Sequence, residues 1–94
     1  MITAVITGST KGIGRGLAEE FVKRGHNAVI CSRNLADVEQ VALELTTMGP
    51  GKCSGAACDI ADKQQVQALW NHARQTYGQV DIWINNAGRA CSRH

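Results

Sequence analysis

Three glycines and a lysine near the start of the sequence could together hold an anion. They follow the first apolar run directly, at Gly8, Lys11, Gly12 and Gly14. A phosphate at a strand-to-helix turn accepts hydrogen bonds from free backbone N–H groups and is favoured by the helix dipole, provided that no Cβ blocks its approach. The spacing therefore predicts a phosphate-binding turn, with a glycine-rich turn of purely structural role as the alternative. A Walker A loop is disfavoured, because no Gly-Lys-Ser/Thr triplet occurs.

Polar residues also follow three later apolar runs. These are Ser32, Arg33 and Asn34, then Asp59 with Ile60, then Asn85-Asn86-Ala87-Gly88. In parallel sheets flanked by helices, ligands bind at the carboxyl ends of the strands. The polar residues are therefore expected beside the glycine turn, provided that the apolar runs are strands of one parallel sheet.

Short apolar runs rich in β-branched residues alternate with helical patterns along the chain. The expected strands are 2–7, 27–32, about 53–58 and 80–84. The expected helices run over 13–24, from a cap at Asn34 to a break at 48–51, and from a cap at Asp62 to a stop at Gly78.

All three helices have apolar residues at a spacing that predicts their buried faces. In the first helix they are Ile13, Leu17, Phe21 and Val22. In the second helix they are Leu35, Val38, Val41 or Ala42, and Leu45. In the third helix they are Val66, Leu69, Trp70, Ala73 and Tyr77.

This alternation predicts the α/β class, because strands joined by helices form a parallel sheet covered on both faces. The expected architecture is a Rossmann-type, doubly wound parallel sheet of four strands, in the spatial order 3-2-1-4, with three helices. We expect one dinucleotide-binding domain over residues 1–94, truncated after the fourth strand. A chain of 94 residues is short enough for its stability to be marginal.

Motifs spread along the chain resemble those of the short-chain dehydrogenase/reductase family. Thr7-Gly8-x-x-x-Gly12-x-Gly14 is similar to the family's glycine fingerprint, and Asn85-Asn86-Ala87-Gly88 is a motif specific to the family. The resemblance covers the family's cofactor-binding half only. Within the family, the wording of ITGSTKGIG, VICSRN, CDI and DIWINNAG looks most like that of chlorophyll(ide) b reductases, which reduce a 7-formyl group with NADPH or ferredoxin.

The resemblance implies a role for each motif in holding a dinucleotide. The glycine turn would bind the pyrophosphate, Asp59 and the backbone of Ile60 the adenine, and residues 85–88 would steady the sheet and line the adenosine ribose. Structural alternatives stay open: Asp59 as a turn cap, and the two asparagines as partners of neighbouring backbone. The expected cofactor contacts are Gly8, Ser9, Thr10, Lys11, Gly12, Ile13, Gly14, Ser32, Arg33, Asn34, Asp59, Ile60, Asn85, Asn86, Ala87 and Gly88.

The residues after the second strand favour NADP(H) over NAD(H). NAD-selective sites place Asp or Glu there to hold the ribose 2′-hydroxyl, whereas this chain has Ser32 and Arg33. A guanidinium offers a 2′-phosphate several donors and a full charge, and Lys11 could add a second cation. Both positions are basic in NADP-preferring members of the family, so the resemblance agrees. The alternative is that Lys11 and Arg33 are ordinary solvated surface residues.

Hydride transfer in the family depends on a Tyr-x-x-x-Lys pair, which this sequence lacks. Tyr77 is the single tyrosine, and the fourth residue after it is Asp81. No catalytic residue is therefore assigned, and the chain alone is expected to be inactive. We expect the NADP(H)-binding portion of a reductase with a small-molecule carbonyl substrate; the alternatives are a non-catalytic NADP(H)-binding module and one half of a split enzyme. A homo-oligomer is expected only with the family's C-terminal half present.

Composition disfavours several other classes of function. The net charge of +2 is too small to favour nucleic acid or an anionic membrane as a partner. The cysteines form no Cys-x-x-Cys pair, so we expect free thiols in a reducing compartment and no metal site. Because Met1 stands directly before the first strand, a cytoplasmic protein is expected, or a chloroplast protein from which a transit peptide was removed.

Overall fold

Strands and helices alternate through the described part of the chain, which comprises residues 1–8 and 12–86 of a computed structural model. The strands are β1 (Thr3–Thr7), β2 (Asn27–Ser32), β3 (Lys52–Ala57) and β4 (Ile82–Ile84). The helices are α1 (Gly12–Lys23), α2 (Leu35–Thr46) and α3 (Lys63–Tyr77). The order predicted from the apolar pattern is confirmed, and β2 has the predicted bounds.

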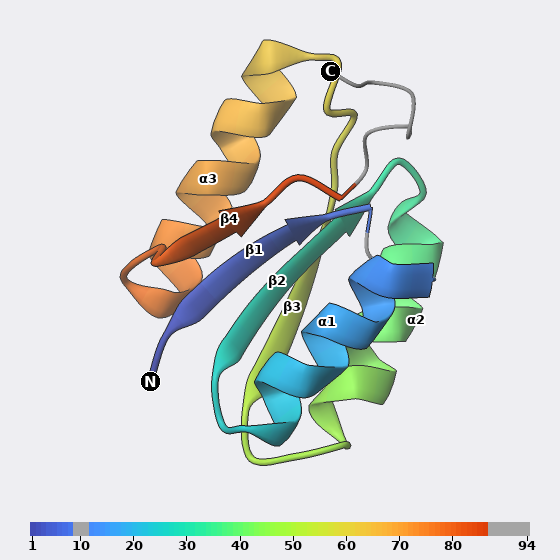
Figure 1. Cartoon of the computed structure of the whole chain (residues 1–94). Helices are drawn as coiled ribbons and strands as arrows, with labels where there is room; N and C mark the ends of the chain where they lie inside the picture. The colour runs from blue at the N-terminus through green and yellow to red at the C-terminus, as the bar shows by residue number, and fades with distance from the viewer. Residues whose placement is uncertain (9–11, 87–94) are drawn as a thin grey trace.

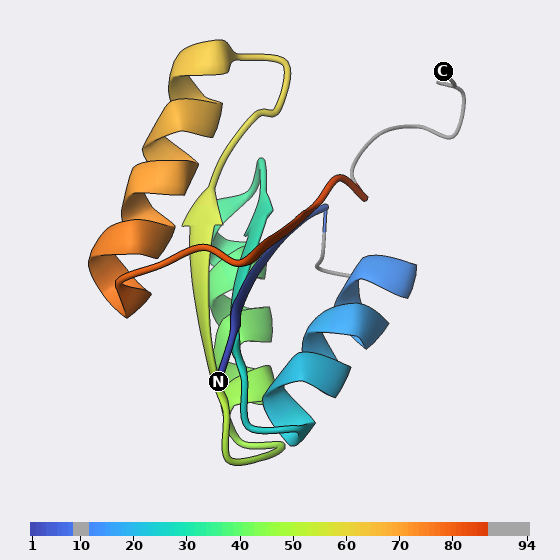
Figure 2. The same ribbon diagram turned by 60° about the vertical axis from the view of Figure 1, so that its left-hand side comes forward.

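The strands form one parallel sheet in the order β3-β2-β1-β4, as predicted. β1 lies between two neighbours, with Thr7 opposite Cys31 of β2 and Ile6 opposite Ile84 of β4. Figures 1 and 2 show α1 and α2 on one face of the sheet and α3 on the other. The fold is therefore the doubly wound α/β architecture of the Rossmann type.

The central strand β1 is covered on both faces, and all of its residues are buried. Because side chains of a strand point alternately to opposite faces, β1 and β2 contribute to two separate cores. Ile6 and Ile30 pack with residues of α1 and α2. Val5 and Val29 pack with Leu69 of α3 on the other face. The sheet is thus held between two apolar layers.

The buried face of α1 differs from the predicted one. The residues that face the sheet are Gly14, Ala18 and Val22. Ile13, expected on this face, is 77% exposed, and Leu17 and Phe21 are only partly buried at its margin. The small residues Gly14 and Ala18, one helical turn apart, let the helix backbone approach the sheet closely. Ile13 then lies on the solvent side of the helix.

The buried face of α3 is predicted correctly except at Trp70. Leu69 and Ala73 are buried, but Trp70 is 37% exposed. Its ring lies beside Trp83 of β4, the outermost strand on that side of the sheet. Trp70 is therefore at the margin of the core, where the described part of the chain covers it incompletely.

The predicted break at 48–51 packs tightly against the end of α1. The Gly51 N–H donates a hydrogen bond to the Val22 carbonyl at 2.9 Å. A Cβ on Gly51 would collide with the His26 carbonyl oxygen, so that only glycine fits there. By contrast, a Cβ on Gly16, in the middle of α1, would meet no described atom within 4 Å.

Replacing each of these glycines with alanine should change the free energy of unfolding in opposite directions. Gly51→Ala should destabilise the chain by about 2–3 kcal/mol, because backbone atoms rather than flexible side chains must move. Gly16→Ala should stabilise it by ~0.5–1 kcal/mol, because alanine favours the helix. Urea unfolding followed by circular dichroism measures both values, and equal stability of the two variants would contradict the packing at Gly51.

Candidate functional site

The polar segments predicted from the sequence meet at the carboxyl edge of the sheet. Gly8 follows β1, Ser32 ends β2, Asp59 lies just beyond β3, and Asn85 follows β4. Because the strands are parallel and paired in register, their ends lie side by side, as Figure 1 shows for β1, β2 and β4. Five expected contacts lie outside the described residues: Ser9, Thr10, Lys11, Ala87 and Gly88.

The turn that leaves β1 is fixed by both neighbouring strands. Gly8 has a φ of +63°, which favours glycine, and its N–H donates to the Cys31 carbonyl at 3.1 Å. On the other side, the Asn86 backbone N–H donates to Thr7 Oγ1 at 2.9 Å. Asn86 Nδ2 donates to the Gly8 carbonyl at 3.1 Å. Asn86 thus bonds neighbouring backbone, which is the structural alternative that the sequence allows for it.

The amino end of α1 lies close to this turn in the sequence. Gly12 begins the helix with a φ of +67°, and Gly14 is buried against the sheet. A Cβ built on Gly12 would meet no described atom within 4 Å. Glycine is therefore favoured at this position by its positive φ, and not by a lack of space for a side chain. The first turn of α1 carries no acidic side chain. Its N–H groups, which have no partner within the helix, and the helix dipole suit an anion.

The turn after β2 combines a helix cap with an exposed cation. Asn34 Oδ1 accepts a hydrogen bond from the Asp37 N–H at 3.0 Å and so caps α2. Ser32 Oγ accepts one from the Asn34 N–H at 3.2 Å. Arg33 is exposed and has no hydrogen bond or ion pair from its side chain to a described residue. Ser32 and Asn34 thus shape the turn, and the guanidinium of Arg33 is uncommitted.

Asp59 holds the turn between β3 and α3. Its Oδ1 accepts a hydrogen bond from the Ala61 N–H at 2.9 Å, and its own N–H donates to Gln65 Oε1 at 2.7 Å. The carboxylate therefore caps a turn, which is the alternative that the sequence leaves open. Ile60, the next residue, is 39% exposed and lines a pocket.

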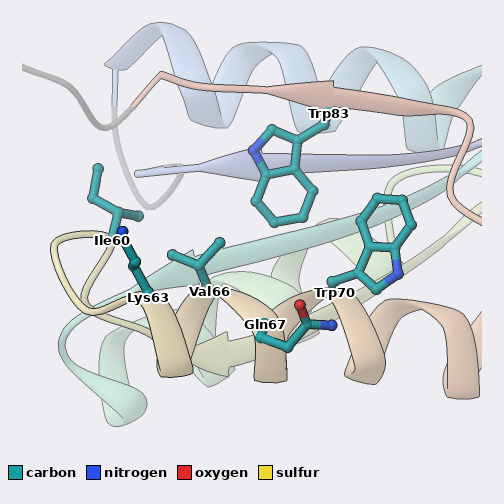
Figure 3. Close-up of a pocket in the computed structure, with 6 residues that line it drawn as sticks. All are labelled: Ile60, Lys63, Val66, Gln67, Trp70 and Trp83. Carbon is teal, nitrogen blue, oxygen red and sulfur yellow. The ribbon is translucent and has the colours of Figure 1, made fainter.

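This pocket, of about 460 Å³, lies between α3 and β4. Its lining residues are Ile60, Lys63, Val66, Gln67, Trp70 and Trp83 (Figure 3). The ring centroids of Trp70 and Trp83 are 6.1 Å apart and their planes are tilted by 34°. Trp83 Nε1 donates to Asn85 Oδ1 at 2.9 Å. This contact is not predicted from the sequence, although Asn85 directly follows β4 and lies two residues after Trp83 in the chain.

Titratable side chains near the core are not suited to proton transfer or metal binding. Burial raises the pKa of Tyr77 to about 12, whereas a phenol that exchanges protons near neutral pH needs a lowered pKa. Burial also raises the pKa of Cys31 to about 11 and that of Cys53 to about 12, which makes both thiols unreactive.

Within the described ranges, no three His, Cys, Asp or Glu side chains are grouped as a metal site requires. None of the helices described has both the length and the apolar character to cross a membrane.

Known proteins share this sequence pattern and this fold. The model of the short chain dehydrogenase family matches residues 2–94. The chain belongs to this family. It is 48% identical over 85 residues to "Chlorophyll(ide) b reductase NOL, chloroplastic" of Oryza sativa subsp. japonica, and 44% identical over 84 residues to the protein of the same name from Arabidopsis thaliana. The predicted likeness to chlorophyll(ide) b reductases is confirmed.

A solved structure of a family member has the same arrangement. L-sorbose reductase from Gluconobacter frateurii, complexed with NADPH and L-sorbose, superposes with a TM-score of 0.86 at 35% identity. The match covers 94% of this chain and 34% of that one. The two plant matches each cover 89% of this chain, but 25% and 24% of the relatives. The chain therefore spans about a quarter to a third of the length of these proteins.

The hydrogen bonds that Asn86 donates to Thr7 and Gly8 lead to a prediction about stability. Asn86→Ala removes the donor to the Gly8 carbonyl and should lower the free energy of unfolding by ~0.5–1.5 kcal/mol. Asn86→Asp should cost about 1–3 kcal/mol at neutral pH, because a carboxylate then faces a carbonyl oxygen. The pKa of that introduced carboxyl should be raised in the folded chain, so the deficit should shrink at acidic pH, where the protonated acid can donate.

Urea unfolding at neutral and acidic pH, each referred to the unsubstituted chain, measures these differences. Asn71→Ala, at an exposed position of α3, is the control and should change stability by less than about 0.5 kcal/mol. A deficit for Asn86→Asp that is independent of pH would argue against the contact with the Gly8 carbonyl.

The partly buried thiol of Cys53 and phenol of Tyr77 predict a loss of stability in alkali. The pKa of Cys53 is raised from 9.0 to about 12 and that of Tyr77 from 10.0 to about 12. The unfolded chain therefore loses these protons first, so the contribution of these two groups to the free energy of unfolding should be constant below about pH 9 and fall toward about pH 12. Urea midpoints under reducing conditions should show this decline, and it should be shallower in Cys53→Ala and in Tyr77→Phe. A urea midpoint that stays constant as the pH rises from about 9 to about 12 would show that burial does not raise the pKa values of Cys53 and Tyr77.

Proposed function

We propose that this chain is the NADP(H)-binding portion of a short-chain dehydrogenase that reduces a carbonyl group by hydride transfer from NADPH. The observation that carries the proposal is the position of Arg33. The hydrogen bond from Gly8 to the Cys31 carbonyl joins the glycine turn to β2 only two residues before Arg33. What supports the proposal is therefore that Arg33, exposed and without a described partner, follows the end of β2 that is bonded to the Gly8 turn.

The residues present fit the groups of this cofactor. The turn at Gly8 and the amino end of α1 would hold the pyrophosphate, and Arg33 would face the 2′-phosphate of the adenosine ribose. Asp59 and Ile60 would lie near the adenine, and Asn85 near the ribose. A bound NADPH would supply the hydride. Asn34 and Asn86 would support this site through the backbone, because their side chains cap α2 and bond Gly8 respectively.

The choice of a carbonyl substrate is supported by the relatives' names. The plant relatives are named as chlorophyll(ide) b reductases, and the solved structure is a reductase bound to NADPH and a sugar. We extend the reaction class, reduction of a carbonyl in a chlorophyll-like molecule, to the longer protein of which this chain would be the cofactor-binding part. Its compartment would be the chloroplast if a transit peptide is removed, as the relatives' names suggest, and the cytoplasm otherwise.

A non-catalytic NADP(H)-binding module, or one half of a split enzyme, is the second candidate. Within the residues given, Tyr77 has no lysine four residues on and burial raises its pKa to about 12, so these residues bind a cofactor without supplying the proton transfer. NADPH oxidation in the presence of carbonyl compounds distinguishes these alternatives. It is measured with the purified chain alone and with the chain mixed with any polypeptide encoded directly downstream. NADPH oxidation only in the mixture would favour a split enzyme, and binding without oxidation in either would favour a module.

Substitution of Arg33 tests the choice of cofactor. Arg33→Asp should weaken NADPH binding by about 1.5–3 kcal/mol, or roughly ten- to a hundredfold, because a carboxylate would face the 2′-phosphate. Binding of NADH, which lacks that phosphate, should weaken much less. Titration of the fluorescence of each reduced cofactor gives both affinities.

Arg24→Asp is the matched control for this experiment. Arg24 is exposed at the opposite end of α1, where it pairs with Glu20, and the substitution changes the net charge equally. Loss of this exposed ion pair should change the free energy of unfolding little. The NADPH affinity of Arg24→Asp should therefore stay close to that of the unsubstituted chain. An unsubstituted chain that binds NADH as tightly as NADPH would refute the proposed specificity.

A further inference from the structure

Trp83 packs against side chains on the face of the sheet that α3 covers. It lies on β4 and packs against the core formed by Val5, Val29 and Leu69. Trp70 of α3 lies at 6.1 Å between ring centroids, and Figure 3 shows the two indoles at the same pocket. An indole packed in this way has few accessible rotamers. Its N–H group is therefore a fixed point close to the carboxyl edge of the sheet.

This fixed N–H determines which way the Asn85 amide faces. An indole nitrogen donates only, whereas an asparagine amide has an accepting oxygen and a donating nitrogen. The bond from Trp83 Nε1, at 2.9 Å, therefore selects Asn85 Oδ1. Asn85 Nδ2 is then directed away from the indole, and it has no partner among the described residues. The exposed end of Asn85 is consequently a hydrogen-bond donor.

We propose that Trp83 is a positioning residue for the cofactor: it fixes the Asn85 amide so that Nδ2 donates to an acceptor oxygen or nitrogen of the dinucleotide. This inference rests on the proposed function, because Asn85 lies at the proposed cofactor site. Without the indole N–H, the amide rotates between two orientations, one of which presents Oδ1 and repels the acceptor. Trp83 itself does not touch the cofactor. Trp70 supports the Trp83 ring but has no hydrogen bond of its own to a described residue.

The test is a double-mutant cycle on NADPH binding. Trp83→Phe keeps an aromatic ring against Trp70 and removes only the donor, and it should weaken NADPH binding about fivefold, as expected for one lost hydrogen bond. Trp70→Phe, the same change on the other side of the pocket, should leave the affinity within about twofold. In an Asn85→Ala background, Trp83→Phe should have no further effect. Thermal unfolding of each variant confirms that it is folded before it is titrated.

A second measurement reads the hydrogen bond without any cofactor. In a ¹⁵N-labelled chain, the indole N–H proton resonance of Trp83 should move upfield in Asn85→Ala, which removes the acceptor. It should not move upfield in Asn85→Asp, whose carboxylate keeps an accepting oxygen. Asn85→Asp should nevertheless weaken NADPH binding, because it replaces the outward donor with a carboxylate. That pair of results separates the role of Oδ1 from that of Nδ2.

The possible outcomes distinguish this inference from the function on which it rests. An unsubstituted chain that does not bind NADPH overturns the proposed function and this inference with it. A chain that binds NADPH, but whose Trp83→Phe variant binds equally well, overturns only the inference. An equal loss from Trp83→Phe with and without Asn85 would also overturn it, because Trp83 would then act through packing alone. Fivefold weakening that disappears in the Asn85→Ala background supports it.

Discussion

The turn after β1 depends on hydrogen bonds from both of its neighbouring strands. β2 accepts the Gly8 N–H through the Cys31 carbonyl, and the residue that follows β4 by two positions, Asn86, returns bonds to Thr7 and Gly8. These bonds are possible only because the three strands end at the same level, with Thr7 opposite Cys31 and Ile6 opposite Ile84. A shift of one residue in register would move the side chains of a strand to the opposite face. The pairing of the sheet therefore sets the position of Gly8, where the chain leaves β1.

Most polar residues at this edge have a structural contact within the chain. Asn34 caps α2, Asp59 caps the turn before α3, and Asn86 holds Gly8. These groups are not available in full to a ligand, and their effect on one is to fix the backbone around it. Groups at this edge that have no partner among the described residues include the guanidinium of Arg33 and the outward nitrogen of Asn85. Together with the amino end of α1, they all suit acceptors and anions.

Local sequence signals predict the fold and the polar residues at the carboxyl edge of the sheet better than they predict how side chains pack. β2 was predicted to the residue, because an apolar run lies between a glycine stop and an asparagine cap. The buried face of α1 is predicted correctly at Val22 but not at Ile13. The contribution of Gly14 and Ala18 is missed, since both are weakly apolar and show their role only when the sheet lies against them. The exposure of Trp70 and the bond from Trp83 to Asn85 depend on how α3 lies against β4, and no local pattern encodes that.

The fold is shared by dinucleotide-binding relatives, but it does not determine which dinucleotide this chain prefers. Arg33 has no described partner, so a carboxylate in its place would leave the sheet and both cores unchanged. It would nevertheless reverse the sign of the interaction with a 2′-phosphate. Two unit charges 4 Å apart interact by about 1 kcal/mol in bulk water and about 4 kcal/mol at an effective dielectric constant near 20. On the proposed function, cofactor choice thus depends on one exposed side chain, which a sequence reveals and a backbone superposition does not.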